Sequence, residues 1–322
     1  MEVTLRVKRY DPETNGKGSS QDYTVDVDKD ASLLDALIQV REEQDGTLAF
    51  RAGCRTGFCG DCTMNVNGKG AITCRTLMSK GLKGAKDGPI ELAPLKQVKI
   101  VKDLMYDADT FHWAKFKAVE PWVEAAEAPN GSEHLMTNEV TQKLREAMSC
   151  TQCGLCDTGC TVIDVDKTFL GPAALTKAYR VVFDTRDTRT KDRLERLSMK
   201  RGMWDCTHCF EASEHCPKHI EPTDRIFDMH DEAIKNEAGP PSVVNHYKSF
   251  AASVKAHGWL DEGRLAIETE GYTNVKGLLK LLPFAIKAGM KGKRPMPYMF
   301  HKKRPGADRI KRIFDKWEDN GK

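Results

Sequence analysis

Four closely spaced cysteines near the middle of the chain constrain its fold more than any other feature. Residues 149–160 place them in the pattern Cys-x2-Cys-x2-Cys-x3-Cys. Three thiolates at this spacing can face one cubane iron–sulfur cluster from a single loop, whereas the fourth starts a helix, points away and serves a second cluster. A further cysteine run downstream can complete that second cluster. The first run is Cys150, Cys153, Cys156 and Cys160, and the second is Cys206, Cys209 and Cys216.

Length and composition are those of a soluble protein with two ordinary domains and an appendage. The 322 residues are 40% hydrophobic and 30% charged, which is typical of globular proteins. A net charge of +3 predicts no general nucleic-acid binding, and the N-terminus lacks the apolar core of an export signal. Eleven cysteines in such a chain favour metal ligation over disulfides.

Residues 1–105 are predicted to form a small α/β domain. Residues 3–9 and 22–27 alternate apolar and polar side chains and are expected to pair as strands. Ser32 can cap a helix that continues to Glu42. Residues 63–66 and 71–73 flank Asn67-Gly68, a dipeptide typical of tight hairpin turns.

The same domain contains a different cysteine motif. Its spacing, Cys-x4-Cys-x2-Cys with a distal cysteine, is that of plant-type [2Fe–2S] ferredoxins. Gly53, Gly57 and Gly60 permit a tight loop whose amides can point at sulfur. A structural zinc site is the alternative, because it also uses paired cysteines, but a gap of four residues followed by a gap of two favours the cluster. The four cysteines are Cys54, Cys59, Cys62 and Cys74.

Residues 106–149 are interpreted as a connecting segment, and residues 150–240 are expected to be helical outside the cysteine loops. Helices are predicted over residues 141–147, 172–183, 191–199 and 223–235. An aromatic packing surface is predicted where the two domains meet, with ordinary core packing as the alternative for each side chain. Its members are Phe111, Trp113, Phe116, Val119 and Trp122. The basic stretch 185–201 is interpreted as a solvated face and not as a nucleic-acid site, because acidic residues are interspersed in it.

Residues 241–322 contain no cysteine and end in a basic tail. From Lys287 to Lys322 there are twelve Lys or Arg and four Asp or Glu. Residues 289–293 and 294–297 interrupt the helical pattern, and residues 278–290 are a candidate for a short interfacial helix. For this extension we rank contact with a partner subunit first, contact with an anionic membrane surface second, and a free tail third.

The order of the motifs resembles that of a known family. A plant-type [2Fe–2S] domain followed by a helical two-cluster ferredoxin domain is similar to the iron–sulfur subunit of succinate dehydrogenase and fumarate reductase. Residues 102–111, Lys-Asp-Leu-Met-Tyr-Asp-Ala-Asp-Thr-Phe, resemble the family's interdomain segment, and residues 169–180 with 184–187 resemble its helix between the cysteine runs. The resemblance covers roughly residues 1–230.

The resemblance implies an α+β fold. Residues 1–105 would be a β-grasp plant-type ferredoxin domain, and residues 106–240 an α-helical two-cluster ferredoxin domain. Residues 241–322, which the resemblance does not cover, are predicted from their composition to be a basic C-terminal extension for partner or membrane-surface contact. The resemblance also implies three clusters. The [2Fe–2S] ligands would be Cys54, Cys59, Cys62 and Cys74, the [4Fe–4S] ligands Cys150, Cys153, Cys156 and Cys216, and the ligands of the third cluster Cys160, Cys206 and Cys209.

The implied function is an electron relay within the respiratory chain and the tricarboxylic acid cycle. The chain would carry electrons between the FAD of a flavoprotein subunit and a quinone or another carrier, as a peripheral subunit on the cytoplasmic face of the cytoplasmic membrane. Its second partner would be a cytochrome b-like membrane anchor or a cysteine-rich subunit. The chain has no Gly-x-Gly-x-x-Gly motif after a predicted strand, so we expect the dicarboxylate chemistry on the flavoprotein and no catalytic residue here.

Two departures from the family concern the quinone site and the electron acceptor. Cys160 is followed by Thr161 where the family has a proline and then tryptophans, and Thr207 stands where it has a histidine. The second cysteine run also resembles the small iron–sulfur subunit of heterodisulfide reductases, in Cys-Thr-His-Cys-Phe and in His-Cys-Pro. Subunits of that kind pass electrons to a cysteine-rich partner. A zinc-binding scaffold without redox function is the alternative of another class.

The third cluster lacks a fourth cysteine. An ordinary two-cluster ferredoxin would have one at position 212, where this chain has Ala212. Three thiolates suit a [3Fe–4S] cluster, because its three irons need one cysteine each. The alternative is a [4Fe–4S] cluster completed by hydroxide or by Glu211, Ser213 or His215, although oxygen and nitrogen ligands to such clusters are exceptions to thiolate ligation.

Overall fold

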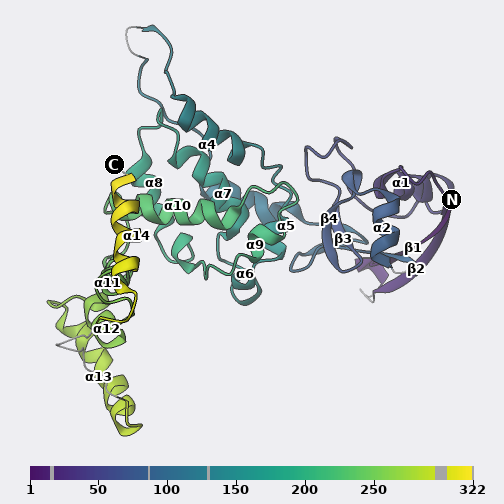
Figure 1. Cartoon of the computed structure of the whole chain (residues 1–322). Coiled ribbons are helices and arrows are strands. Elements are labelled where there is room, and N and C mark those ends of the chain that lie inside the picture. The colour runs from purple at the N-terminus through teal and green to yellow at the C-terminus, as the bar shows by residue number, and fades with distance from the viewer. Residues whose placement is uncertain (15–17, 86–87, 129–130, 294–302, 321–322) are drawn as a thin grey trace. The chain divides into compact units, whose positions relative to one another are not determined.

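The computed structural model describes residues 1–14, 18–85, 88–128, 131–293 and 303–320. The chain falls into two compact units, Met1–Ala233 and Ile234–Lys322. Figure 1 shows the course of the chain in each of them.

The first unit begins with a five-stranded mixed sheet. The strand order is β2-β1-β5-β3-β4. The central pair, β1 and β5, is parallel, whereas β1 with β2, β3 with β4, and β3 with β5 are antiparallel. The strands are β1 (Glu2–Arg9), β2 (Ser19–Asp26), β3 (Thr63–Val66), β4 (Lys69–Ile72) and β5 (Ile90–Ala93). Two helices, α1 (Leu33–Glu43) and α2 (Met78–Ala85), complete this part.

Local sequence signals explain these elements. Val3, Leu5 and Val7 alternate with polar residues along β1 and are all buried, as expected for a strand with one face on the core. At the start of α1, the Ser32 hydroxyl accepts from the Asp35 amide, and the Asp35 carboxylate accepts from the Ser32 amide, which is a capping box. The predicted strands and helix are therefore confirmed, with ends shifted by one to three residues.

The predicted hairpin is also present. Residues Asn67 and Gly68 connect β3 and β4 with φ angles of 50° and 81°. A two-residue turn with two positive φ angles matches the right-handed twist of the flanking strands. The hairpin matters for the site because Cys62 immediately precedes β3 and Cys74 follows β4 within a short helical turn, Thr73–Arg75.

Short elements lead from the sheet into the helical part. They are β6 (Ile100–Lys102), β7 (Met105–Tyr106), a π-helical turn (Asp109–Trp113) and α3 (Ala114–Ala118). Phe111 and Phe116 are buried here, but Trp113 and Trp122 are 42% and 52% exposed. Val119 is buried as well. The predicted packing is thus correct for Phe111, Phe116 and Val119 and wrong for the tryptophans, because sequence does not show which face of the helical turn at Trp113 is covered, and Trp122 lies outside any helix.

The helical part is built around α7 (Gly171–Val182), ten of whose twelve residues are buried. Its neighbours in the chain are α4 (Asn138–Met148), α5 (Leu155–Thr158), α6 (Thr161–Val165), α8 (Thr190–Leu197), α9 (Glu211–Glu214) and α10 (Pro222–Lys235). A short helical turn, Met203–Asp205, lies between α8 and α9, and another, Pro12–Thr14, lies between β1 and β2 of the sheet. The four helices predicted in this region are all present, and α4 begins three residues earlier than expected.

The basic stretch 185–201 is an ion-pair network and not simply a solvated face. The Arg193 side chain is only 3% exposed and pairs with the fully buried Asp187 carboxylate. Arg186 pairs with Asp184, and Arg189 bridges Glu124 and Asp192. The prediction of a solvated face is wrong for Arg193, because paired charges can be buried when every donor finds an acceptor.

Within its described residues, the second unit has four helices of its own: α11 (Pro241–His257), α12 (Glu262–Glu270), α13 (Val275–Met290) and α14 (Ala307–Asn320). Helix α11 packs against α12 and α14, and Lys255 of α11 forms ion pairs with Asp315 and Glu318 of α14. Helix α13 ends at Met290, as the predicted break at residues 289–293 required, whereas residues 294–297 lie outside the described residues. No helix in the described part of the chain is long and apolar enough to cross a membrane.

Candidate iron–sulfur sites

The four cysteines of the N-terminal motif come together around one loop. The Cys54 thiol accepts hydrogen bonds from the amides of Thr56, Phe58 and Cys59 at 3.2–3.4 Å. Two amides of the same loop donate to other thiols, Cys54 to Cys59 and Gly57 to Cys74. The Cys62 thiol accepts from the amide of Cys74, which follows β4. The loop and Cys74 together therefore present backbone N–H groups to all four sulfur atoms.

These amides change the acidity of the exposed Cys54. Hydrogen bonds from the Thr56 side chain and from three backbone amides lower the pKa of its thiol to about 6, because they stabilise the thiolate. Burial, reinforced by Cys62, instead raises the pKa of Cys74 to about 12. Gly57 makes the loop possible: its φ of +77° favours glycine, and a side chain there would collide with Arg75.

The second group joins three cysteines of one run to one of the other. Cys150, Cys153, Cys156 and Cys216 line the same small pocket, together with residues from the start of α7 and α10. Burial, together with the charges of Cys150 and Cys216, raises the pKa of Cys153 to about 11. Cys156 is fully buried, and burial, Asp157 and the other three cysteines raise the pKa of its thiol well above the usual value.

The third group consists of Cys160, Cys206 and Cys209. Burial, together with the charges of Cys160 and Cys209, raises the pKa of the Cys206 thiol. Burial also raises the pKa of the Cys160 thiol, and the charge of Cys209 acts in the same direction. The Thr161 hydroxyl lies 3.5 Å from the Cys209 sulfur. Cys160 directly precedes α6 and is its N-terminal boundary residue, so its side chain belongs to a different group from those of Cys150, Cys153 and Cys156.

Two of the three alternative fourth ligands at this site are engaged elsewhere. The Ser213 hydroxyl accepts a hydrogen bond from the Thr223 amide at 3.3 Å. The His215 Nδ1 atom lies 2.8 Å from the Glu211 carbonyl oxygen. Ala212 itself is buried and offers no ligand atom.

The three groups fit iron–sulfur clusters. None of the eleven cysteines forms a disulfide bond. Buried thiols with raised pKa values require a nearby cation to remain thiolates. Among the described residues, no three His, Cys, Asp or Glu side chains surround one point closely enough to hold a single metal ion. A cluster makes a weaker demand, because its thiolates are divided over several irons: two on each iron of a [2Fe–2S] cluster and one on each iron of a cubane-type cluster.

Comparison with known proteins identifies the family to which this chain belongs. Residues 4–113 match the model of a 2Fe-2S iron-sulfur cluster binding domain, and residues 146–220 that of a 4Fe-4S dicluster domain. The chain is 33% identical over 226 residues to the fumarate reductase iron-sulfur subunit of Mycobacterium tuberculosis, which spans 70% of this chain and 90% of that protein. The chain belongs to the iron–sulfur subunit family of fumarate reductase and succinate dehydrogenase.

Other relatives agree. The fumarate reductase iron-sulfur subunit of Haemophilus influenzae is also 33% identical, over 236 residues that span 70% of this chain and 90% of that protein. A chain of the Mycobacterium smegmatis Sdh1 complex in the apo form has a TM-score of 0.63 and 25% identity, with coverage of 74% of this chain and 98% of the other. The predicted fold class, the oxidoreductase family and the [2Fe–2S] and [4Fe–4S] cofactors are confirmed, and the zinc alternative loses its support.

The iron–sulfur subunit brings its first two ligand loops into direct contact. Gly60 of the first loop has a φ of +76°, and a side-chain carbon placed on it would lie 2.8 Å from Cys153 Cα and 2.9 Å from Cys153 Cβ. Gly70 of β4 likewise leaves room for the Leu155 side chain. Both glycines permit close approach of the sheet to the second cysteine loop.

A buried tyrosine packs against a residue that contacts the second cysteine loop. The rings of Tyr106 and Phe111 meet edge to face with centroids 5.7 Å apart, and Phe111 lies against Gly154 of that loop. Burial is the main cause that raises the pKa of Tyr106 to about 12. Sequence reasoning placed Gly60 in the loop around the first cluster but did not predict its contact with Cys153. It missed Gly70 and Tyr106.

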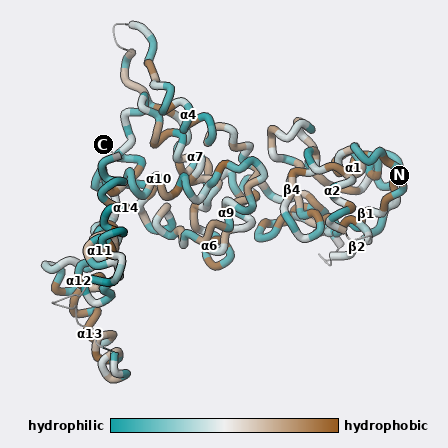
Figure 2. The backbone as a smooth tube through the Cα atoms, viewed as in Figure 1, coloured by the Kyte–Doolittle hydropathy of each residue, from teal (hydrophilic) through white to brown (hydrophobic). Residues whose placement is uncertain are grey.

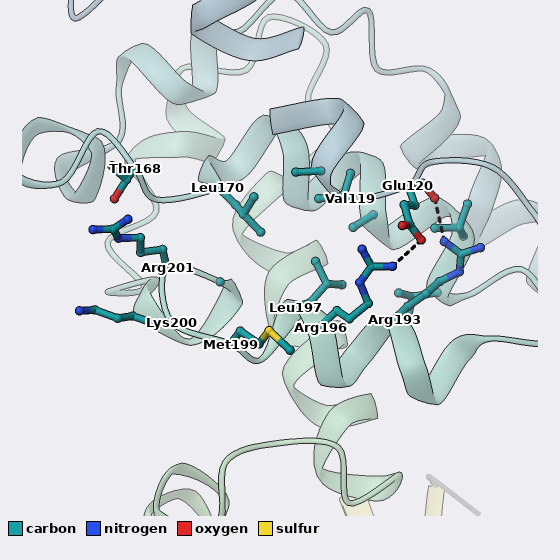
Figure 3. Close-up of a pocket in the computed structure, with 15 residues that line it drawn as sticks. Val119, Glu120, Thr168, Leu170, Arg193, Arg196, Leu197, Met199, Lys200 and Arg201 are labelled. Carbon is teal, nitrogen blue, oxygen red and sulfur yellow. Dashed lines mark hydrogen bonds and ion pairs between the residues drawn. The ribbon is translucent and has the colours of Figure 1, made fainter. Parts of the chain in front are cut away.

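A further pocket in the helical part contains no cysteine among its lining residues. Figure 3 shows Arg193 and Arg196 converging on Glu120, with Lys200 and Arg201 at the other end of the pocket. Arg196 forms an ion pair of 2.6 Å with the Glu120 carboxylate, and Arg193 donates to the Glu120 carbonyl at 2.7 Å. These arginines bind α8 to the segment after α3, which is a structural role.

Proposed function

We propose that this subunit relays electrons between the FAD of a flavoprotein subunit and a quinone or another carrier through three clusters. Its proposed ligand sets are Cys54, Cys59, Cys62 and Cys74 for [2Fe–2S]; Cys150, Cys153, Cys156 and Cys216 for [4Fe–4S]; and Cys160, Cys206 and Cys209 for [3Fe–4S]. The observation that carries the proposal is the gathering of eleven cysteines from separate segments into these three groups.

When bound, such clusters supply one-electron transfer at potentials set by their hydrogen bonds and burial. The chain's own contribution is to hold and space them. Amides of the first loop donate to thiolates, which stabilises negative charge at sulfur. The contact of Gly60 with Cys153 keeps the first two ligand loops close.

The proposed flavoprotein contact is the first cysteine loop. Cys54 is exposed, and the adjacent Phe58 side chain is 80% exposed. Large aromatic side chains are enriched among the residues that dominate protein interfaces. A flavoprotein seated on this loop would bring its FAD towards a cysteine group with an exposed ligand, Cys54.

The electron acceptor on the other side has two candidates. A cytochrome b-like membrane anchor with a quinone is the acceptor suggested by the family. Thr161, whose hydroxyl lies near Cys209, and Thr207 stand where the family has proline and histidine, which favours the second candidate, a cysteine-rich subunit of the heterodisulfide-reductase kind. In either arrangement we propose a peripheral subunit on the cytoplasmic face of the membrane, with residues 1–105 and 106–240 carrying the clusters and residues 241–322 as an extension.

Single-turnover reduction by succinate tests the relay. The anaerobically purified chain is mixed with its FAD-containing partner, and the three cluster signals are followed by electron paramagnetic resonance after rapid freezing. We expect reduction only in the presence of the partner. Reduction of the isolated chain by succinate would overturn the proposal.

Two variants test the order in which electrons reach the three clusters. Cys59→Ser should alter or remove the first cluster signal and slow succinate reduction of the other two, while dithionite still reduces them. Cys209→Ser, the matched control at the opposite end, should leave succinate reduction of the first two clusters unchanged. Equal effects of both substitutions on the first two clusters contradict the proposed order.

A further inference from the structure

Helix α13 exposes a continuous apolar stripe. Five of its apolar side chains are between 53% and 76% exposed. At 100° per residue they fall within about 80° of one another on the helix surface. They are Val275, Leu279, Leu282, Ile286 and Met290. Figure 2 shows hydrophobic residues along this helix, and soluble proteins rarely leave so coherent an apolar surface without a binding role.

Lysines form a parallel stripe at the edge of the apolar one. Lys276, Lys280 and Lys287 are exposed and span about 40° of the helix surface, directly beside the position of Met290. Lys291 and Lys293 continue the positive charge beyond the helix. Residues 271–293 contain no Asp or Glu, so none of these charges is balanced within the segment.

We propose that α13 binds directly to the surface of an anionic membrane, lying in the plane of the headgroups. The apolar stripe would enter the boundary between headgroups and acyl chains, and the lysines at its edge would extend to lipid phosphates. Cores of protein–protein interfaces are depleted of lysine, whereas an apolar face bordered by unbalanced lysines is typical of interfacial helices. Anionic lipid is therefore favoured over a protein partner.

This inference goes beyond the electron relay. It gives the chain a membrane contact of its own, in a unit that contains no cluster ligand, in addition to any contact through partner subunits. It also reverses the order expected from sequence alone, in which a partner subunit ranked above the membrane. The reason is the exposed stripe, which sequence periodicity could not distinguish from a buried helix face.

Sedimentation with vesicles tests the proposal. The full holo-chain is mixed with phosphatidylcholine vesicles that either contain or lack phosphatidylglycerol. We expect binding to the anionic vesicles only, weakened by high salt because the lysine contribution is electrostatic. The triple variant Lys276→Gln, Lys280→Gln, Lys287→Gln should bind about a hundredfold more weakly, given the usual contribution of each lysine near an anionic surface.

Matched variants separate charge from apolar burial. Lys80→Gln, Lys83→Gln, Lys191→Gln removes three exposed lysines elsewhere and should bind like the unaltered chain. Leu279→Ser with Ile286→Ser should lose binding although all lysines remain. Absence of binding by the unaltered holo-chain, or equal weakening by the two lysine triples, overturns the proposal. Succinate reduction through the flavoprotein is independent of α13, so these outcomes leave the relay untouched.

Discussion

At Gly60, a hydrogen atom in place of a side chain lets the first two cysteine groups lie close together. Gly60 lies against the Cys153 backbone, and its positive φ adds a second reason for glycine. Gly70 permits the approach of Leu155 in the same way, so two small residues allow a contact whose effect concerns two cofactors.

We predict that Gly60→Val slows electron transfer between the first two clusters and destabilises the chain. The positive φ costs about 1–2 kcal/mol for a non-glycine residue, and the collision with Cys153 adds about 1–3 kcal/mol. Gly68→Val is the matched control, because Gly68 has a φ of +81° but nothing within 4 Å. It should lose only the backbone contribution and keep the wild-type transfer rate, measured by freeze-quench spectroscopy. Equal transfer rates in both variants contradict this role of Gly60.

At the third group, the buried Ala212 decides the expected cluster type. The unaltered, oxidised holo-chain should show the resonance of a [3Fe–4S] centre. Ala212→Cys should add one iron per chain and convert this centre to [4Fe–4S] with a lower potential. Ala178→Cys, at a buried alanine of α7, is the control and should change neither iron content nor resonance. Four irons at this site in a fresh, unoxidised sample of the unaltered chain reject the [3Fe–4S] assignment.

Local elements were predictable because their signals are local. The Ser32 cap and the Asn67-Gly68 turn act within four residues, and both lie where expected. Cysteine spacing has the same character, since one loop must supply most ligands of a cluster. The contact of Gly60 with Cys153 and the burial of Arg193 were not predictable, because each depends on residues more than sixty positions apart that only the tertiary fold brings together.

The buried arginine of α8 predicts a difference between two similar residues of one helix. Arg193 donates to the Asp187 carboxylate and to the carbonyl oxygens of Glu120 and Trp122, whereas Arg196 is 42% exposed. Arg193→Lys loses the planar fork and leaves buried acceptors unpaired, so it should lower the free energy of unfolding by about 2–4 kcal/mol. Arg196→Lys should cost at most about 0.5 kcal/mol. Anaerobic urea unfolding of the two holo-variants compares them, and similar losses would argue against the network.

The stability of the whole first unit depends on two buried histidines that the relay does not use. His112 is 4% exposed and His230 is 3% exposed. Burial lowers the pKa of each to about 4, with Arg51 adding to the effect at His112. The carbonyl oxygen of Met203 opposes the shift at His230, but burial prevails. Both imidazoles are therefore neutral in the folded chain at neutral pH.

This neutrality makes the folded chain sensitive to mild acid. Between about pH 6.5 and pH 4 the unfolded chain binds protons that the folded chain does not, so the free energy of unfolding falls as the pH falls. From about pH 7 to about pH 5.5 each histidine should account for about 1.2 kcal/mol of loss. His112→Phe and His230→Gln should each reduce the acid-induced loss in the free energy of unfolding by about 1.2 kcal/mol. Anaerobic urea unfolding at the two pH values measures this loss. The exposed His246→Gln variant is the control and should keep the full dependence. If all three variants lose stability with acid as the unaltered chain does, carboxylates and not the buried imidazoles govern the response.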